Sequence, residues 1–169
     1  MTTTDTAQLD ADLAVMADQE RLLQLPALNG DVAWDLGQRL RAAALARGAA
    51  VTIEVRIAGE TAFFHAMAGT APANADWARR KRNVVELQGE SSYRVGRQLL
   101  RDDRTLEGMM GLPTRDYGAH GGCFPLRVGG QLLGSVTVSG LPQREDHEML
   151  VAVLAEMVGV PASAVAWRS

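Results

Sequence analysis

The sequence lacks several features that would assign a protein class directly. It contains one cysteine, Cys123, so no internal disulfide can form, and it has no Cys/His spacing typical of a zinc site. No apolar run approaches the roughly 20 residues that a membrane-spanning helix requires. The segment 1–12 has no basic side chain, so it is not a secretory signal. These absences predict a soluble cytoplasmic protein without a membrane partner.

Basic residues are also scarce: 17 Lys and Arg stand against 20 Asp and Glu, for a formal net charge of −3. This balance argues against general binding to DNA or RNA. The segment 77–127 differs from the rest, with ten basic against six acidic residues. A basic middle between acidic flanks can attract a small anion or pair with a second copy of the chain. Alternatively, these charges only solvate helix faces.

The length of 169 residues suits one domain, 1–169, with a polar start at 1–6 that we expect to be disordered. Apolar residues recur every three or four positions over 9–23 and again over 32–43, which predicts two helices. In the first of these stripes Glu20 is the one polar member. Asp31 can cap the second helix, and Gly48 can end it.

Four segments have the pattern of strands, and each pair is joined by a short turn containing Gly. They are Val51–Ile57, Thr61–Met67, Cys123–Val128 and Gln131–Ser139. The fourth is apolar enough to be central, whereas Pro125 places the third near an edge of the sheet. Tight hairpins imply an antiparallel sheet.

Helical patterns fill the remaining segments. One helix begins at Asn74 or Asp76, Gly89 interrupts it, and Ser91 or Ser92 caps its continuation. The stretch 101–122 is predicted to be an irregular connection with one short element, and a last helix spans about 144–158. Helices segregated from an antiparallel sheet predict an α+β fold.

The segment from His120 to Gly140 resembles the GlcG/HbpS-like haem-degrading family. It has the Gly-Gly strand start followed by Pro, a short hairpin, a Gly in the next strand and a closing Ser-Gly, and Asp146 opens the last helix. The stretch from Trp77 to Ser92 resembles the middle helix of that family. The resemblance covers about 34–158 and is nearest to a subgroup of uncharacterised fungal and bacterial proteins.

The resemblance implies a three-layer α/β/α fold of the profilin-like type, with an antiparallel sheet of about five strands. It also implies assembly into homo-oligomers, either dimers or larger. Some relatives bind haem or iron and are linked to haem breakdown, and others are domains attached to cobalamin or glycolate metabolism. Fold does not determine function, so the function has to be argued from the individual residues of the site.

The three histidines, His65, His120 and His147, are the first candidates for chemistry, since imidazole is a common ligand of haem iron and a common acid or base. His120 is the strongest candidate, because nearby glycines let a flat cofactor or a phosphate approach the backbone. We therefore predict a ligand site at Tyr117, His120, Gly121 and Gly122. Alternatively, the glycines only supply positive φ angles.

The basic run 79–82 surrounds its helix rather than lining one face, because neighbouring residues point about 100° apart. Lys81 and Arg82 are predicted to bind an anionic group such as a haem propionate or a phosphate. The alternative is that this run pairs with acidic residues of the flanks, within one subunit or between two.

Glu145 and Glu148 lie on one side of the last helix next to His147, and this spacing can hold iron or calcium. Acidic residues in a first helical turn are also expected from the helix dipole alone. Cys123 has no partner pattern for catalysis, and we expect a buried, inert thiol.

Two functions from different classes follow. The first is binding of a small, anionic molecule, with haem or iron as the cofactor that the resemblance suggests, and with enzymatic activity unassigned. The second is a homo-oligomeric module, without enzymatic activity, that recognises protein. A third, an enzyme acting on a small acid or phosphate, rests only on the metabolic setting of the relatives.

Overall fold

The computed structural model describes residues 3–167, which form seven helices and four strands within that range. The helices are α1 (Thr3–Leu22), α2 (Gly30–Ala46), α3 (Pro72–Gln88), α4 (Ser92–Arg101), α5 (Leu106–Met110), α6 (Gln143–Val158) and α7 (Ala162–Val165). The strands are β1 (Thr52–Ile57), β2 (Glu60–Ala66), β3 (Cys123–Val128) and β4 (Gln131–Ser139). No helix in the described range is long and apolar enough to cross a membrane.

The four strands form one antiparallel sheet in the order β2-β1-β4-β3. The predicted α+β class is confirmed, and the sheet has four strands where about five were expected. β4 is central and β3 is an edge strand, as its Pro125 predicted. The other edge is β2, whose outer backbone has no neighbouring strand among residues 3–167.

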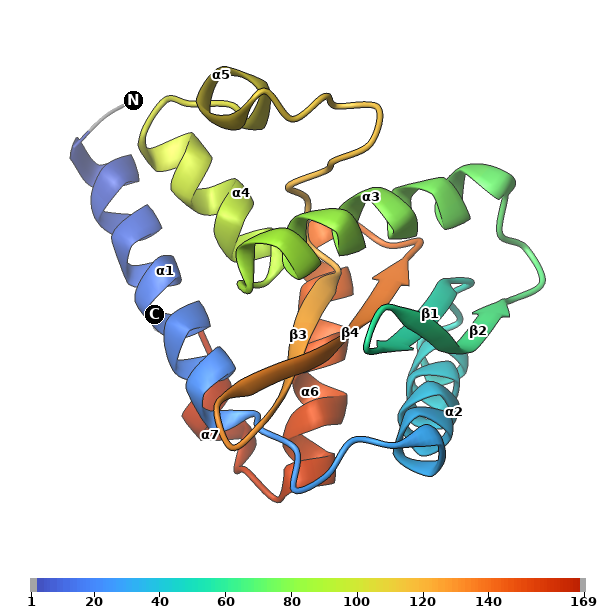
Figure 1. The fold of residues 1–169 in the computed structure, drawn as a ribbon. Helices are drawn as coiled ribbons and strands as arrows, with labels where there is room; N and C mark the ends of the chain where they lie inside the picture. The colour runs from blue at the N-terminus through green and yellow to red at the C-terminus, as the bar shows by residue number, and fades with distance from the viewer. Residues whose placement is uncertain (1–2, 168–169) are drawn as a thin grey trace.

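Helices cover both faces of the sheet and make three layers (Figure 1). α2 and α6 pack together on one face, and α3 crosses the opposite face over β4, β3 and β1. α1 and α4 lie side by side beyond the β3 edge. The three-layer arrangement expected from the resemblance is therefore present.

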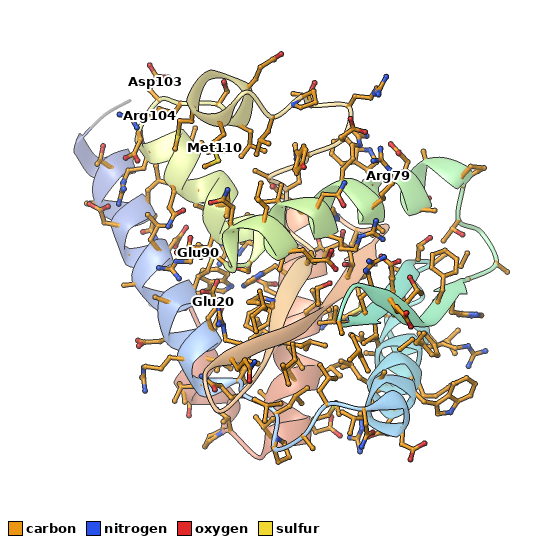
Figure 2. All side chains as sticks on the ribbon, viewed as in Figure 1. Glu20, Arg79, Glu90, Asp103, Arg104 and Met110 are labelled. Atoms are coloured by element: carbon orange, nitrogen blue, oxygen red, sulfur yellow. The ribbon has the colours of Figure 1, made fainter. Side chains whose placement is uncertain are left out.

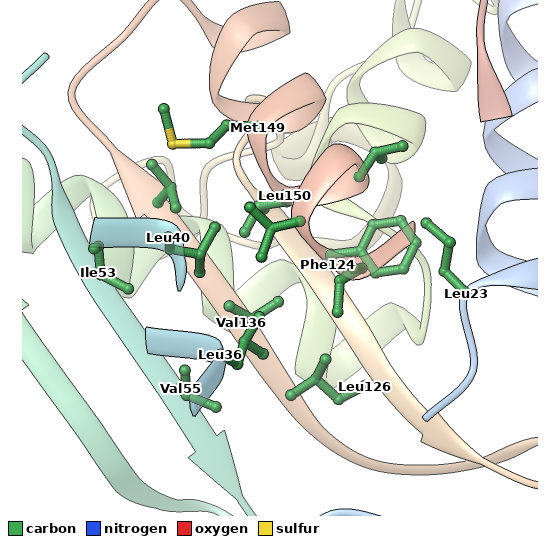
Figure 3. Close-up of a cluster of buried hydrophobic side chains, with 14 of the residues drawn as sticks. Leu23, Leu36, Leu40, Ile53, Val55, Phe124, Leu126, Val136, Met149 and Leu150 are labelled. Carbon is green, nitrogen blue, oxygen red and sulfur yellow. The ribbon is translucent and has the colours of Figure 1, made fainter. Parts of the chain in front are cut away.

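The main hydrophobic core lies between the sheet and the layer formed by α2 and α6 (Figure 3). Ile53 and Val55 of β1 and Val136 of β4 point into it, because alternate residues of a strand face the same side. Leu36 of α2 and Leu150 of α6 meet them there and are fully buried. The alternation of apolar residues along the strands therefore predicted the face of the sheet that α2 and α6 cover.

The layer between the sheet and α3 is polar instead. Arg82 of α3 forms a bidentate ion pair with Glu54 of β1, at 2.8 and 2.9 Å. Ser135 of β4 donates to Glu86 of α3 at 3.2 Å. Buried polar groups require partners, so this layer is held by specific pairs rather than by general apolar packing.

The ends of three helices differ from the sequence-based expectation. Asn29, not Asp31, caps α2, since its side chain accepts from the Val32 N–H at 3.0 Å. α3 begins at Pro72, because proline suits a first helical position, and Asn74 lies inside the first turn. α1 already begins at Thr3, so residues 3–6, expected to be disordered, are helical, and residues 1–2 lie outside the described range.

Glu20 was the polar exception in the apolar stripe of the first predicted helix, and its contacts explain it. Its carboxylate accepts from the Ser91 N–H at 2.8 Å and pairs with Arg94 at 2.6 Å. Figure 2 shows Glu20 beside Glu90 at the start of α4. A carboxylate stabilises a helix N-terminus, so the contacts of Glu20 link α1 to the start of α4. Burial nevertheless raises the pKa of Glu20.

Candidate functional site

One cavity brings together two of the predicted site residues, Lys81 and His120. It has a volume of about 240 Å³ and opens where α3, the end of β4, the loop before β3 and the start of α6 meet. It is lined by Asn74, Trp77, Lys81, His120, Ser139, Gly140, Leu141, Gln143 and Asp146. Polar side chains on its walls make it the best candidate for a binding site.

A buried ion pair forms one wall of this cavity. The Lys81 ammonium lies 2.8 Å from Asp146 Oδ2 and donates to the Val138 carbonyl at 3.2 Å. The side chains are only 5% and 1% exposed. The Leu141 N–H donates to the other carboxylate oxygen, Oδ1, at 3.0 Å. Burial raises the pKa of Asp146, and the neighbouring Lys81 charge opposes that rise.

His120 stands at the mouth of the cavity with its ring against Trp77, at a centroid distance of 4.8 Å. Arg80 also stacks on this indole, 3.7 Å from the ring centroid. Burial, with the charges of Lys81 and Arg80, lowers the pKa of His120 below its usual value. Its imidazole is therefore neutral at neutral pH, and its ring nitrogens have no hydrogen-bond partner within residues 3–167.

Gly121 and Gly122 lie behind the cavity wall and are not part of its lining. A Cβ on Gly121 would lie 2.0 Å from the Gln143 carbonyl oxygen, and one on Gly122 would lie 2.7 Å from Lys81 Nζ. Their missing side chains therefore let the loop before β3 pack directly on α6 and on the ion pair.

Tyr117 and Arg82, also predicted as site residues, lie elsewhere. Tyr117 packs against the apolar cluster of Val84, Val95 and Leu106. Arg82 is one position past Lys81 and so points about 100° away around α3, to Glu54. The structure thus brings only Lys81 and His120 of the six proposed ligand-binding residues to the cavity lining.

Each of the four residues 79–82 forms an ion pair with an acidic residue of the same chain, as the alternative interpretation of the basic run predicted. Arg79 pairs with Asp76 and Asp116, and Arg80 pairs with Asp76. Figure 2 shows Arg79 on the outer side of α3. The Lys81 pair also lines the cavity described above.

The weak metal candidates do not gather around one point. Glu145 is exposed, while Glu148 binds Arg144 and the Trp167 indole N–H. His147 is fully buried. Within residues 3–167 no group of three His, Cys, Asp or Glu side chains is placed to hold a metal ion.

The contacts of His147 determine its tautomer. Gln19 donates its amide N–H to the Val165 carbonyl at 2.7 Å, so the Gln19 carbonyl oxygen faces His147 Nε2 at 2.8 Å. Nε2 must therefore carry the proton, and Nδ1 is buried without a partner among the described residues. Burial, with the charge of Arg144, lowers the pKa of His147 to about 3.

This depressed pKa predicts an acid-sensitive fold. Above pH 6.5 His147 is neutral in both states, but below it only the unfolded chain takes up the proton. The free energy of unfolding should therefore fall between pH 6.5 and about 3, by up to about 1.4 kcal/mol per pH unit from this group. Urea unfolding of wild type and His147→Gln between pH 7 and 4 measures this slope. Equal slopes in the two proteins would contradict the assignment.

Cys123 is fully buried, as expected, and its thiol accepts from the Thr137 hydroxyl at 3.0 Å. Burial raises the pKa of Cys123 to about 12. The reactive thiolate is therefore not populated near neutral pH, and the thiol is inert in the folded protein.

A second cavity, of about 330 Å³, lies between α1, α6 and α7 and is lined mainly by Ala and Val side chains. Its polar groups already have partners within the protein, since Gln19 binds His147 and Glu148 binds Trp167. The smaller cavity is therefore the better site for chemistry.

Seven cavity residues escaped the sequence-based prediction: Asn74, Trp77, Ser139, Gly140, Leu141, Gln143 and Asp146. Trp77 and Asp146 stood in the segments that carried the family resemblance but were given no role. Asn74 and Gln143 each sit in the first turn of a helix, where a polar residue is normally interpreted as a cap. Ser139 ends a strand in the Ser-Gly pair of the resemblance, and it too was given no role.

Comparison with known proteins identifies the family. The family described as "Haem degrading protein HbpS-like" matches residues 28–155. This chain belongs to the HbpS-like family. The UPF0303 protein of Azotobacter vinelandii is 53% identical over 151 residues, covering 89% of this chain and 91% of that protein. The UPF0303 protein of Serratia proteamaculans is 44% identical over 158 residues, covering 93% and 98%.

Solved structures agree with this assignment. The Ybr137w protein superposes with a TM-score of 0.81 at 27% identity, over 87% of each chain. HbpS superposes with a TM-score of 0.62 at 20% identity, over 79% of this chain and 91% of HbpS. A complex named PduOC:Heme gives a TM-score of 0.67 at 17% identity, over 76% and 94%. At the identities of the last two, the likeness shows the fold alone.

Proposed function

We propose that this protein binds a small molecule in the cavity where Lys81 and His120 meet. The observation that carries the proposal is His120 itself, a neutral imidazole without a hydrogen-bond partner among residues 3–167, at the mouth of a polar cavity. A neutral ring nitrogen is the form that binds a metal or accepts a proton. The other two histidines do not line this cavity.

Haem is the ligand suggested by the family, and the residues present fit it in part. His120 would supply an imidazole ligand to haem iron, and Trp77 beside it would supply an aromatic surface. The cavity of about 240 Å³ is smaller than the roughly 300 Å³ at which pockets for drug-sized ligands begin. A cavity of this volume cannot enclose the whole macrocycle. Bound haem would supply redox chemistry at iron, with the protein supplying the ligand and the polar pocket.

A haemin titration followed at the Soret band tests this proposal. Wild type should bind one haemin saturably, and His120→Ala should weaken binding by about tenfold or more, because the axial ligand is lost. His65→Ala is the matched control, since His65 lies on β2 outside the cavity. Binding that is absent, or equal in the two variants, would remove haem from the proposal.

The second candidate function is the homo-oligomeric interaction module. It is favoured by the unpaired β2 edge, where Phe64 is 52% exposed and Trp34 of α2 is 61% exposed. An exposed edge strand with apolar neighbours can pair with a second copy. An oligomer mass in solution, together with no response to haemin, would favour this function over ligand binding. For either function we propose a cytoplasmic location and one domain over 1–169.

A further inference from the structure

We infer that the interior of this cavity is a site for an oxyanion, a carboxylate or a phosphate, and that Asn74, Ser139, Gln143 and Lys81 donate the hydrogen bonds. The inference rests on the proposed function and specifies its ligand class. It depends on counting which atoms of these side chains already have partners.

The two amide side chains are oriented so that their NH₂ groups are free to donate. The Asn74 carbonyl oxygen accepts from the Ala71 N–H at 2.8 Å. The Gln143 carbonyl oxygen accepts from the Gly121 N–H at 3.3 Å. Because a backbone N–H must face oxygen, these contacts determine the orientation of both amides. Each NH₂ group therefore remains available to donate, while each carbonyl oxygen is turned toward the backbone N–H that it binds.

Ser139 is a buried polar residue whose hydroxyl has no partner. It is 3% exposed and lines the cavity, and its hydroxyl makes no hydrogen bond among the described residues. Alternation along β4 places its side chain on the α3 side, since Ser135 and Thr137 bind Glu86 and Cys123 there while Val138 faces the core. This hydroxyl is therefore available to donate to a group that enters the cavity.

Lys81 adds a charged donor. Its ammonium has three protons, and Asp146 and the Val138 carbonyl take two of them. The third proton has no protein partner among residues 3–167.

Asp146 is the one acid of the cavity, and its charge is already compensated. One carboxylate oxygen accepts from Lys81 and the other from the Leu141 N–H. The cavity also meets the start of α6, whose N-terminal peptide dipoles favour negative charge. An arrangement rich in donors, with its one acid paired to Lys81, favours an oxyanion over a cation or a neutral amine.

Two isosteric variants test the inference without disturbing the fold. Asn74→Asp and Gln143→Glu each keep an oxygen that accepts the same backbone N–H, but each replaces two donors by negative charge. Both positions lie in the first turn of a helix, where an acid is favourable, so stability should not fall. The probes are inorganic phosphate and succinate, titrated by calorimetry at low ionic strength.

We expect saturable one-to-one binding to wild type and a loss of about tenfold or more in each acidic variant, because like charge opposes the anion. Ser139→Ala should weaken binding by about twofold to tenfold through loss of one hydrogen bond. Ser135→Ala is its matched control, because that hydroxyl lies on the same face of β4 but outside the cavity. Anion binding that is absent, or unchanged in both acidic variants, would overturn the inference.

Haemin and its dimethyl ester separate the two sources of the oxyanion. If a haem propionate occupies the site, succinate should displace haemin, and the ester should bind more weakly than haemin. If a free small acid or phosphate occupies it, the anion probes should bind with the expected variant pattern while haemin is not displaced. Haemin binding that depends on His120 but ignores Asn74→Asp and Gln143→Glu would leave the proposed function standing without the oxyanion site.

Discussion

Lys81→Met should lower the free energy of unfolding by about 3–5 kcal/mol, the cost of leaving one member of a buried ion pair without its partner. In this variant Asp146, 1% exposed at its side chain, would lose its charged partner and keep only hydrogen bonds from the backbone, such as that of the Leu141 N–H. Urea unfolding at pH 7 measures the change. The loss should shrink at lower pH, because protonation of Asp146 removes the unpaired charge.

Two further variants make this result specific to the buried pair. Arg79→Met, two positions earlier on α3, breaks exposed ion pairs and should cost no more than about 1 kcal/mol. Lys81→Met combined with Asp146→Asn should be more stable than Lys81→Met alone, since it removes the unpaired charge. A Lys81→Met variant no less stable than Arg79→Met would show that the pair does not hold the α3 layer.

Gly122→Ala should be a severely damaging substitution in the loop before β3, costing about 4 kcal/mol or more. A Cβ there would lie 2.4 Å from the Val138 carbonyl oxygen and 2.9 Å from the Asp146 Cβ, and the backbone has φ of +119°. The first contact is with backbone of the central strand, which cannot move aside. The second would separate Asp146 from Lys81.

Gly130→Ala provides the matched control, because Gly130 has a positive φ of +84° but no atom within 4 Å of its Cβ position. It should lose only the conformational cost of a left-handed residue, about 1–2 kcal/mol. Thermal unfolding of the two variants separates steric conflict from backbone strain. Equal losses would mean that the packing of Gly122 on the ion pair contributes nothing.

The polar layer between α3 and the sheet is the structural basis of both predictions and of the proposed site. A core of apolar side chains on the α2 and α6 side already holds the fold together. The α3 side can therefore carry charged and unpaired groups, such as Lys81 and the Ser139 hydroxyl, at a cost that the rest of the molecule offsets. Ligand sites require such charged or unpaired groups. In this protein they lie on the face of the sheet that α3 covers.

The sequence by itself determined the elements of this protein and much of their order. Period-two alternation marked β1, Gly-Gly marked the turn between β3 and β4, and Pro125 marked an edge strand, because each depends on local backbone preferences. It also singled out His120 and Lys81, since their residue types are rare or charged in a segment that resembles a known family. Backbone preferences and residue types can be recognised from neighbouring residues alone.

Only the tertiary structure decided which of these residues meet. Asp146 lies 65 positions from Lys81, and Gln143 lies 22 from the Gly121 N–H that orients it, so no short-range pattern links them. Arg82 and Tyr117 looked equivalent to Lys81 and His120 in the sequence, but the direction of each side chain sends them to Glu54 and to an apolar cluster. A site is made by side-chain directions across distant elements, and those directions are set by packing.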